Sequence, residues 1–185
     1  MAIDGTQGKG RVMPVLKIDN LFARRSIRRF TDQPVEAEQI DMLLKAAMAA
    51  PSANNSKPWH FIVVTDGAIR DALAEAHPYA RMASESPVCI VPCGESGLSR
   101  GSQSEFWIQD LSAATENILL AATGLGLGAV WCGVYPSGER VAAVSRILGI
   151  PERVVPFALI PVGHPAEQKE PRTQYDGNRV HRERW

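Results

Sequence analysis

Hydrophobic and polar residues follow one another along the chain in patterns that predict both helices and strands. Residues 36–50 repeat apolar side chains at helical spacing, which predicts an amphipathic helix that stops before Pro51. Apolar residues in 104–125 spread beyond one narrow stripe, so we expect a long helix that is buried on more than one side. Shorter helices are predicted over residues 19–26, 66–76 and 137–148.

Uninterrupted apolar runs predict strands over residues 59–65, 87–93, 129–134 and 154–163. Pro92 places the second run at a sheet edge or at a strand end, because proline has no N–H for a ladder hydrogen bond. The glycine-rich run at 124–128 follows a helix and precedes a strand, which is the reverse of a dinucleotide-binding fingerprint. We expect these glycines to end the long helix and to allow a sharp turn. The alternation of helices and strands favours a layered helix-and-sheet architecture.

Composition narrows the class of protein. The 185 residues include 20 Lys+Arg and 20 Asp+Glu, and this neutral balance argues against a general nucleic-acid binder. No apolar run reaches the length of a membrane span or of a signal peptide. Cys89, Cys93 and Cys132 form no paired framework, which favours a reducing compartment, so we expect a cytoplasmic protein. Residues 1–18 are expected to form a flexible tail and 19–185 one domain, with a polar C-terminal arm from about residue 165 that packs on another surface through Trp185.

Two polar clusters are candidates for chemistry. Arg24, Arg25, Ser26 and Arg28 supply forked donors and a hydroxyl that suit a phosphate, although such a run is more often a solvated surface. The segment "PSANNSKPW" is either a turn or a loop of donors for a polar, planar ligand, and its residues alone do not decide between these. The sequence has no phosphate-binding P-loop, no zinc-protease motif and no nucleophile elbow, and its histidines do not cluster, so no metal site and no hydrolase centre is predicted.

Four segments in order along the chain resemble the nitroreductase family of FMN-dependent oxidoreductases. These are "RRSIRRF", "APSANNSKPWHFIVV", "QDLSAATENILLAATGLGLGAVWCGVYP" and "VGHPAEQKEPR", and the likeness extends over residues 19–185. The resemblance implies an α+β fold in which helices flank a central, mostly antiparallel sheet. It also implies an intertwined homodimer with two FMN sites at the interface, each built from both chains.

The resemblance also implies the residues that hold the cofactor. Arg24, Arg25, Ser26 and Arg28 would bind the phosphate and ribityl end of FMN, and Arg172 would join them. Pro51, Ser52, Ala53 and Asn55 would approach the flavin from the other subunit, and Gln109 would add a polar contact. Trp131, Cys132 and Gly133 would lie along one face of the isoalloxazine ring. Glu170 stands where the family often has a basic residue, and Lys57 stands where it commonly has glutamine; Lys57 either faces the flavin or points to solvent.

The function implied is transfer of hydride from NADH or NADPH, through flavin N5, to a nitroaromatic, a quinone or a similar small oxidant by a ping-pong mechanism. No side chain is expected to act as a catalytic acid or base, because the flavin carries the chemistry. Three alternatives stay open: a flavin-fragmenting or dehalogenating branch of the family, a flavin-binding protein without turnover, and an RNA-binding or small-anion-binding module built on the arginines. A substrate lid over residues 94–106 would favour the first.

Overall fold

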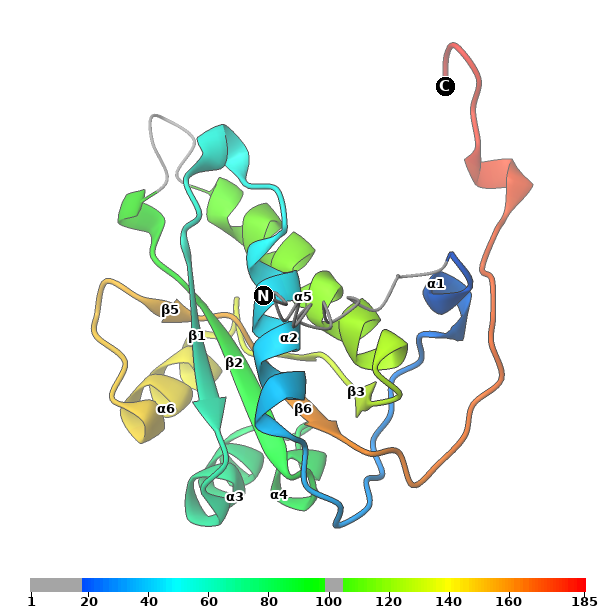
Figure 1. Cartoon of the computed structure of the whole chain (residues 1–185). Helices are drawn as coiled ribbons and strands as arrows, with labels where there is room; N and C mark the ends of the chain where they lie inside the picture. The colour runs from blue at the N-terminus through cyan, green and yellow to red at the C-terminus, as the bar shows by residue number, and fades with distance from the viewer. Residues whose placement is uncertain (1–17, 99–104) are drawn as a thin grey trace, which may run out of the picture.

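The computed structural model describes residues 18–98 and 105–185, in which helices cover both faces of one antiparallel sheet (Figure 1). The main strand order is β1 (Trp59–Val64), β2 (Val88–Gly94), β6 (Ala158–Gly163) and β3 (Gly128–Ala129). Two short strands lie off this path: β4 (Cys132–Gly133) pairs with β6, and β5 (Val155–Pro156) pairs with β2. The expected α+β architecture with an antiparallel sheet is confirmed, but the runs 129–134 and 154–163 each split into two strands.

Pro92 lies inside a central strand, so its expected placement at an edge or a strand end is wrong. β2 has β1 on one side and both β6 and β5 on the other. The carbonyl of Pro92 accepts from Phe157 N–H at 2.8 Å, at the break between β5 and β6. A residue's N and carbonyl point to the same side of a strand, so the missing N–H falls at this break and costs no regular ladder bond.

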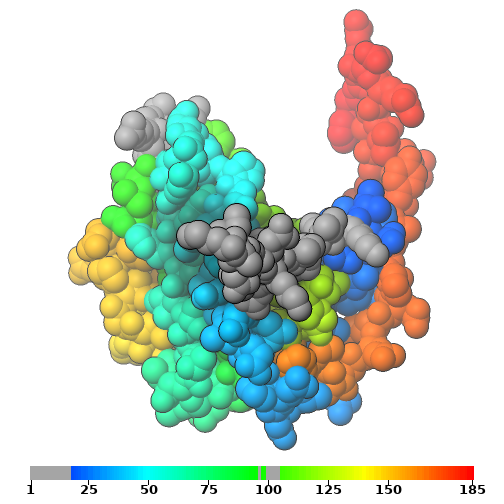
Figure 2. Space-filling view, viewed as in Figure 1, coloured from blue at the N-terminus to red at the C-terminus, as the bar shows by residue number. Residues whose placement is uncertain are grey.

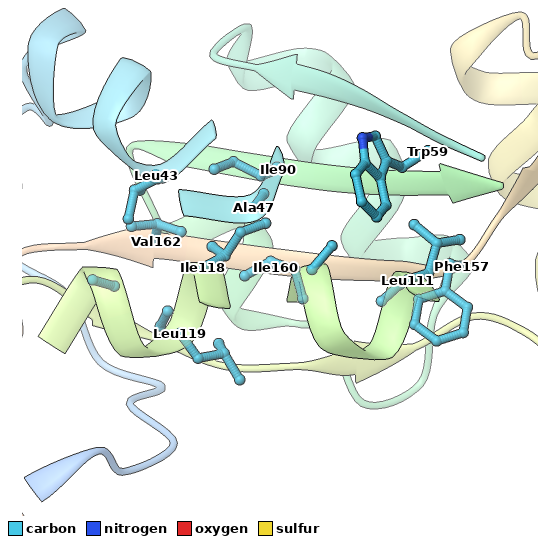
Figure 3. Close-up of a cluster of buried hydrophobic side chains, with 14 of the residues drawn as sticks. Leu43, Ala47, Trp59, Ile90, Leu111, Ile118, Leu119, Phe157, Ile160 and Val162 are labelled. Carbon is cyan, nitrogen blue, oxygen red and sulfur yellow. The ribbon is translucent and has the colours of Figure 1, made fainter. Parts of the chain in front are cut away.

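The core is divided by the sheet into two layers. On one face α2 (Ala37–Met48) and α5 (Phe106–Gly124) pack through Leu43, Ala47 and Ile118 against Ile90 and Ile160 of the strands (Figure 3). On the other face lie α3 (Gly67–Ala76), α4 (Met82–Glu85) and α6 (Gly138–Leu148), covering the alternate residues of β2. Because β2 is covered on both faces, all seven of its residues are buried.

Helix α5 is the central helix, and the expectation that it is buried on more than one side is confirmed. Its described part begins at Phe106, and residues 99–104, which include the expected start, lie outside the described residues. It ends at Gly124, and Gly126 has a φ of 73°, so the glycine-rich run ends the helix as expected. Gly128 then passes so close to Ile27 that a Cβ there would lie 2.7 Å from the isoleucine Cγ2.

Helix α1 (Asp19–Ala23) is shorter than the predicted span of 19–26. The chain becomes extended at Arg24, whose ψ is 121°, and Ser26 forms a parallel bridge to Ala129 beside the sheet. Backbone pairing with β3 therefore overrides helix propensity at Arg24, Arg25 and Ser26. Residues 23–30, "ARRSIRRF", are called the arginine segment below. The expected flexible tail falls almost wholly on residues 1–17, outside the described part of the chain.

The C-terminal segment first follows α1 and then leaves the body of the molecule. Figures 1 and 2 show it rising beside α1 and then projecting beyond every other described element. The projecting part contains the one-turn helix η3 (Gly177–Arg179). Residues 170–185 are exposed, and Trp185 is 100% exposed. Among residues 18–98 and 105–185, no helix combines the length and the apolar character that a bilayer crossing requires.

Candidate functional site

The arginine segment is held in place by the first part of the C-terminal segment. Thr31 and Arg29 pair through their backbones with His164 and Ala166, each bond being 2.9 Å long, and Phe30 bridges Pro165. These bonds lay residues 164–166 antiparallel beside the end of the "ARRSIRRF" segment. Two stretches that lie far apart in the sequence therefore form one surface.

Side chains and backbone groups extend this pairing towards α1. Arg28 N–H donates to Glu167 Oε1 at 2.6 Å, and Lys169 Nζ donates to the Ser26 carbonyl at 2.6 Å. The backbone N–H of Arg172 then donates to the Phe22 carbonyl at 3.1 Å. Arg172, which composition alone did not link to the arginine cluster, thus lies beside it. The Arg28 N–H holds the pKa of Glu167 below its usual value, with help from Lys169.

The arginine segment carries positive charge that is only partly neutralised. Arg24 Nε pairs with Glu116 Oε1 of α5 at 3.1 Å, and burial raises the pKa of Glu116 while Arg24 opposes that rise. The Arg25 guanidinium donates to the carbonyl of Glu170, which is a neutral acceptor. In the described part of the chain no carboxylate forms an ion pair with Arg25, Arg28 or Arg172. This surface can therefore accept a ligand with negative charge.

A cavity of about 650 Å³ joins the arginine segment to strand β4. Arg28 lines it together with the predicted flavin-facing residues Trp131, Cys132 and Gly133. Its remaining wall comes from the segment between α3 and α4, from Val130 and Tyr135, and from the start of α6. Among the described residues that line this cavity there is no carboxylate, and three are arginines: Arg28, Arg81 and Arg140.

Aromatic side chains give the β4 region a rigid backing. Trp131 packs on Phe157 with ring centroids 5.5 Å apart, and Phe157 packs edge-on against Trp107 at 6.1 Å. Trp107 in turn packs against Tyr135 at 4.9 Å. Such edge-to-face contacts fix the angles between the rings as well as burying them. The half-buried Trp131 therefore has a fixed position at the cavity.

Cys132 lines the same cavity but is not a candidate nucleophile. Its Sγ lies 3.5 Å from the Tyr79 carbonyl and 3.9 Å from Met82 Sδ. Burial raises its pKa to about 11, an effect that Arg28 only partly opposes. At neutral pH the side chain is thus a thiol, which is far less reactive than a thiolate.

The loop after α2 is a second, separately anchored part of the predicted site. Ala53 N–H donates to Asp110 Oδ1 of α5 at 2.9 Å, and Lys57 N–H donates to Ser52 Oγ at 3.0 Å. Three residues of the loop have positive φ, near 50°: Asn54, Asn55 and Lys57. Asn residues tolerate this conformation, which explains the "NN" pair between Ala53 and Ser56 in the one-turn helix η1 (Ala53–Asn55). Pro51, Asn55 and Lys57 are exposed in the chain as described.

The loop and the arginine segment lie on different sides of α5. The loop is tied to Asp110, whereas Arg24 is tied to Glu116. Positions 110 and 116 point about 120° apart around a helix and lie about 9 Å apart along it. Exposed Gln109 lies beside Asp110 at the loop's end of the helix. The structure thus brings together Arg24, Arg25, Ser26, Arg28 and Arg172, and joins Arg28 to Trp131–Gly133, but it does not bring Pro51, Ser52, Ala53, Asn55 or Gln109 to the same place.

Four residues of this surface escaped the sequence reasoning: Lys169, Tyr79, Arg81 and Arg140. Lys169 stands one position before Glu170, so a basic residue is present in the expected neighbourhood, and its ammonium reaches Ser26. Tyr79, Arg81 and Arg140 belong to no motif, and only the packing of α3, α4 and α6 places them at the cavity. No local sequence signal marks them.

Comparison with known proteins gives one consistent result. The model of the nitroreductase family matches residues 21–78 and 75–164. A "Putative NADH dehydrogenase/NAD(P)H nitroreductase" of Methanothermobacter thermautotrophicus is 46% identical over 99% of this chain and 92% of its own length. A solved structure with the same description from Parabacteroides distasonis is 42% identical, with a TM-score of 0.86 over 90% of this chain and 97% of that one. An FMN-dependent nitroreductase of Clostridium difficile is 29% identical and superimposes with a TM-score of 0.84, covering 91% of this chain and 100% of that one.

Proposed function

Since the chain belongs to the nitroreductase family, we propose that it is an FMN-dependent oxidoreductase that transfers hydride from NADH or NADPH to a small oxidant such as a nitroaromatic or a quinone. The observation that carries this proposal is the pairing of the arginine segment with residues 164–172. That pairing gathers Arg24, Arg25, Arg28 and Arg172 on one surface, beside a cavity that no described carboxylate lines.

The donor set fits the phosphate of FMN. A terminal phosphate carries up to two negative charges, and forked guanidinium donors match its oxygens. Arg25, Arg28 and Arg172 have no ion-pair partner among the described residues, so their charge is available for a ligand. We assign Arg24, Arg25, Ser26, Arg28 and Arg172 to the phosphate and ribityl end, and we add Lys169, which holds Ser26.

The cavity fits the ring end of the cofactor. Trp131, Cys132 and Gly133 line the cavity on the strand side, where a tricyclic ring would lie against them, and Arg28 lines it as well. Arg81 and Arg140 add positive charge that favours an electron-rich ligand edge. We therefore assign the ring to this wall and Arg28 to both parts of the cofactor site.

When bound, FMN would supply the redox chemistry, by taking hydride at N5 and giving it to the oxidant. The protein binds and orients the cofactor, balances its negative charge and shields one ring face with the Trp131–Gly133 segment. No side chain at the cavity is arranged as a nucleophile with a base: the Cys132 thiol has a raised pKa of about 11, and the arginines are permanently charged. The sequence analysis likewise expects no catalytic acid or base, because the flavin carries the chemistry.

We further propose that the working unit is a homodimer in which Pro51, Ser52, Ala53, Asn55 and Gln109 of one chain complete the site of the other. Two observations support this. The loop lies on a different side of α5 from the arginines, so one chain presents the two groups apart. The C-terminal arm leaves the body with Tyr175 and Trp185 exposed at 78% and 100%, which is unfavourable unless another chain covers them.

Three free, buried cysteines support a reducing, cytoplasmic setting.

The visible spectrum of the purified protein tests the proposal directly. We expect a yellow protein whose flavin, released by denaturation, chromatographs as FMN and not as FAD. Anaerobic NADH or NADPH should bleach the flavin band, and a quinone should restore it. A colourless protein that takes up no added FMN would refute the proposed function. If FMN is bound but neither NADH nor NADPH reduces it, the protein would be a flavin-binding protein without turnover.

A further inference from the structure

His77 is a buried histidine whose two ring nitrogens are both engaged. It follows α3 and is only 1% exposed. Its Nδ1 lies 3.2 Å from the backbone N of Tyr79, and its Nε2 lies 2.8 Å from the carbonyl oxygen of Gly133 in β4. His77 also lines the 650 Å³ cavity. The imidazole therefore connects the segment between α3 and α4 to the strand that forms the cavity wall.

The two partners define the state of the ring. A backbone N–H can only donate, so Nδ1 accepts from Tyr79 and carries no proton. A carbonyl oxygen can only accept, so Nε2 carries the proton and donates to Gly133. His77 is thus held as the neutral Nε2–H tautomer.

The Gly133 carbonyl receives a second donor, which comes from α6. Arg140 Nη1 lies 3.1 Å from the same oxygen, and the Arg140 guanidinium carbon stands 5.6 Å from the centre of the Tyr79 ring, a cation–π geometry. His77 and Arg140 therefore donate to one carbonyl from two parts of the fold, and Tyr79 contacts both of these donors. All three line the cavity with Gly133 itself.

Strand β4 needs this support because it is very short. It consists of Cys132 and Gly133, and within the described residues it pairs only with β6. A two-residue edge strand has few ladder bonds to fix its position. His77 and Arg140 add two hydrogen bonds to the Gly133 carbonyl, next to the place assigned to the flavin ring.

We propose that His77 is a positioning residue of the flavin site, which through its Nε2–H bond to Gly133 sets the Trp131–Gly133 wall against the isoalloxazine ring. The proposal rests on the proposed function and goes beyond it, because it assigns a role to a residue outside the predicted cofactor-binding set. Arg140 shares the role through the same carbonyl.

Two variants of His77 separate hydrogen bonding from packing. His77→Leu fills space but cannot donate, whereas His77→Gln retains an N–H donor. We expect His77→Leu to weaken FMN binding about tenfold, the size of one hydrogen bond to a buried group, and to shift the visible circular dichroism of bound FMN towards that of free FMN. The flavin midpoint potential should shift as well. His77→Gln should stay close to the wild type in all three measurements.

Ser86→Ala is the matched control. Ser86 is fully buried, and its Oγ lies 3.1 Å from the carbonyl oxygens of both Ala83 and Val88, which share its one hydroxyl proton, but it does not line the cavity. We expect this variant to lose thermal stability without any change in flavin spectrum or affinity. The pair His77→Leu with Arg140→Met should lose more FMN affinity than the two single variants together, because only the double variant leaves the Gly133 carbonyl without a donor.

The results distinguish the two levels of inference. A wild-type protein that binds no FMN refutes the proposed function and the positioning role together. If the wild type binds FMN and folded His77→Leu keeps its affinity and spectrum, only the positioning role is refuted. Should His77→Leu fail to fold, His77→Gln decides: a wild-type spectrum supports the role, and a spectrum like that of free FMN overturns it.

Discussion

The backbone N–H of Arg172 donates to the carbonyl of Phe22 at 3.1 Å. This bond closes a series of contacts that begins at Thr31 and His164 and runs back along the arginine segment. Arg172 is exposed, so its guanidinium is free of packing constraints and can reach a ligand on the surface it shares with Arg25 and Arg28. The proposed phosphate site therefore combines residues from the beginning and the end of the described chain.

Arg28→Ala and Arg172→Ala should each weaken FMN binding by about 1.5–3 kcal/mol, the range for hydrogen bonds to charged groups. Each substitution removes a guanidinium that no described carboxylate pairs with. Affinity is measured by the quenching of FMN fluorescence as the apoprotein is titrated.

The control for these variants is Arg146→Ala, an exposed position on α6 outside the cavity. Arg70 is not a neutral control, although it belongs to none of the motifs. Its Nη1 donates to the carbonyls of Ala83, Ser84 and Ser86, which anchors α4 to α3, and its loss would destabilise the fold. Equal FMN affinity in Arg28→Ala, Arg172→Ala and Arg146→Ala would show that the arginines are a solvated surface.

Glu167 should make FMN retention sensitive to acid. Its carboxylate accepts from Arg28 N–H and pairs with Lys169 at 3.2 Å, and its pKa is lowered chiefly by the Arg28 bond. A carboxyl whose pKa is lower in the folded protein stabilises the fold above its ordinary pKa, and this contribution is lost as the pH falls through the lowered value. We expect FMN release in a titration from about pH 6 to about pH 3 to be flatter in Glu167→Gln than in the wild type. Identical release curves would contradict this role.

The sequence predicted element types well and their ends less well. Helical periodicity found α2, α3, α5 and α6, because each buries one face or more against the sheet. The end of α1 was missed because Ser26 pairs with Ala129, a partner that no local pattern reveals. Pro92 was misplaced for the same reason, since only the break between β5 and β6 makes a central proline tolerable.

For the site, the sequence supplied the arginine segment, the loop after α2 and the Trp131–Gly133 wall through the family resemblance. The link between Arg172 and Arg28 could not be derived from spacing, because it depends on a backbone pairing across the whole fold. His77, Arg81 and Arg140 stand singly in the sequence. They become a group only when three helices pack on one face of the sheet.

Gly128 should be required for the shape of the arginine segment. A Cβ at this position would lie 2.7 Å from Ile27 Cγ2, and Ile27 is buried between the arginines. We expect Gly128→Ala to cost about 1–3 kcal/mol of unfolding free energy, the usual range for overpacking, and to weaken FMN binding. Chemical denaturation of Gly128→Ala, Ile27→Ala and the double variant tests this contact.

Ile27→Ala provides space for the added methyl group, so the double variant should be more stable than the sum of the single losses implies. Additive losses would mean that Gly128 matters for its backbone conformation and not for its closeness to Ile27.

The last prediction concerns the homodimer and separates the two parts of the C-terminal segment. Removal of everything after Gly163 deletes both the residues that pair with the arginine segment and the projecting arm, so dimerisation and FMN retention should fall together. Removal of residues 175–185 leaves Lys169, Glu170 and Arg172 in place and takes away only the exposed arm with Tyr175 and Trp185. We therefore expect removal of residues 175–185 to weaken dimerisation while the FMN-binding residues of the same chain stay in place.

Sedimentation velocity over a range of protein concentrations measures this difference, with flavin absorbance followed in the same cell. In the variant without residues 175–185, FMN should be lost as the dimer dissociates, because the loop that carries Asn55 would then no longer cover the flavin of the other chain. Bound FMN should consequently follow the dimer fraction and not the total protein. A truncated monomer that keeps stoichiometric FMN and oxidises NADH or NADPH would show that one chain holds the whole site.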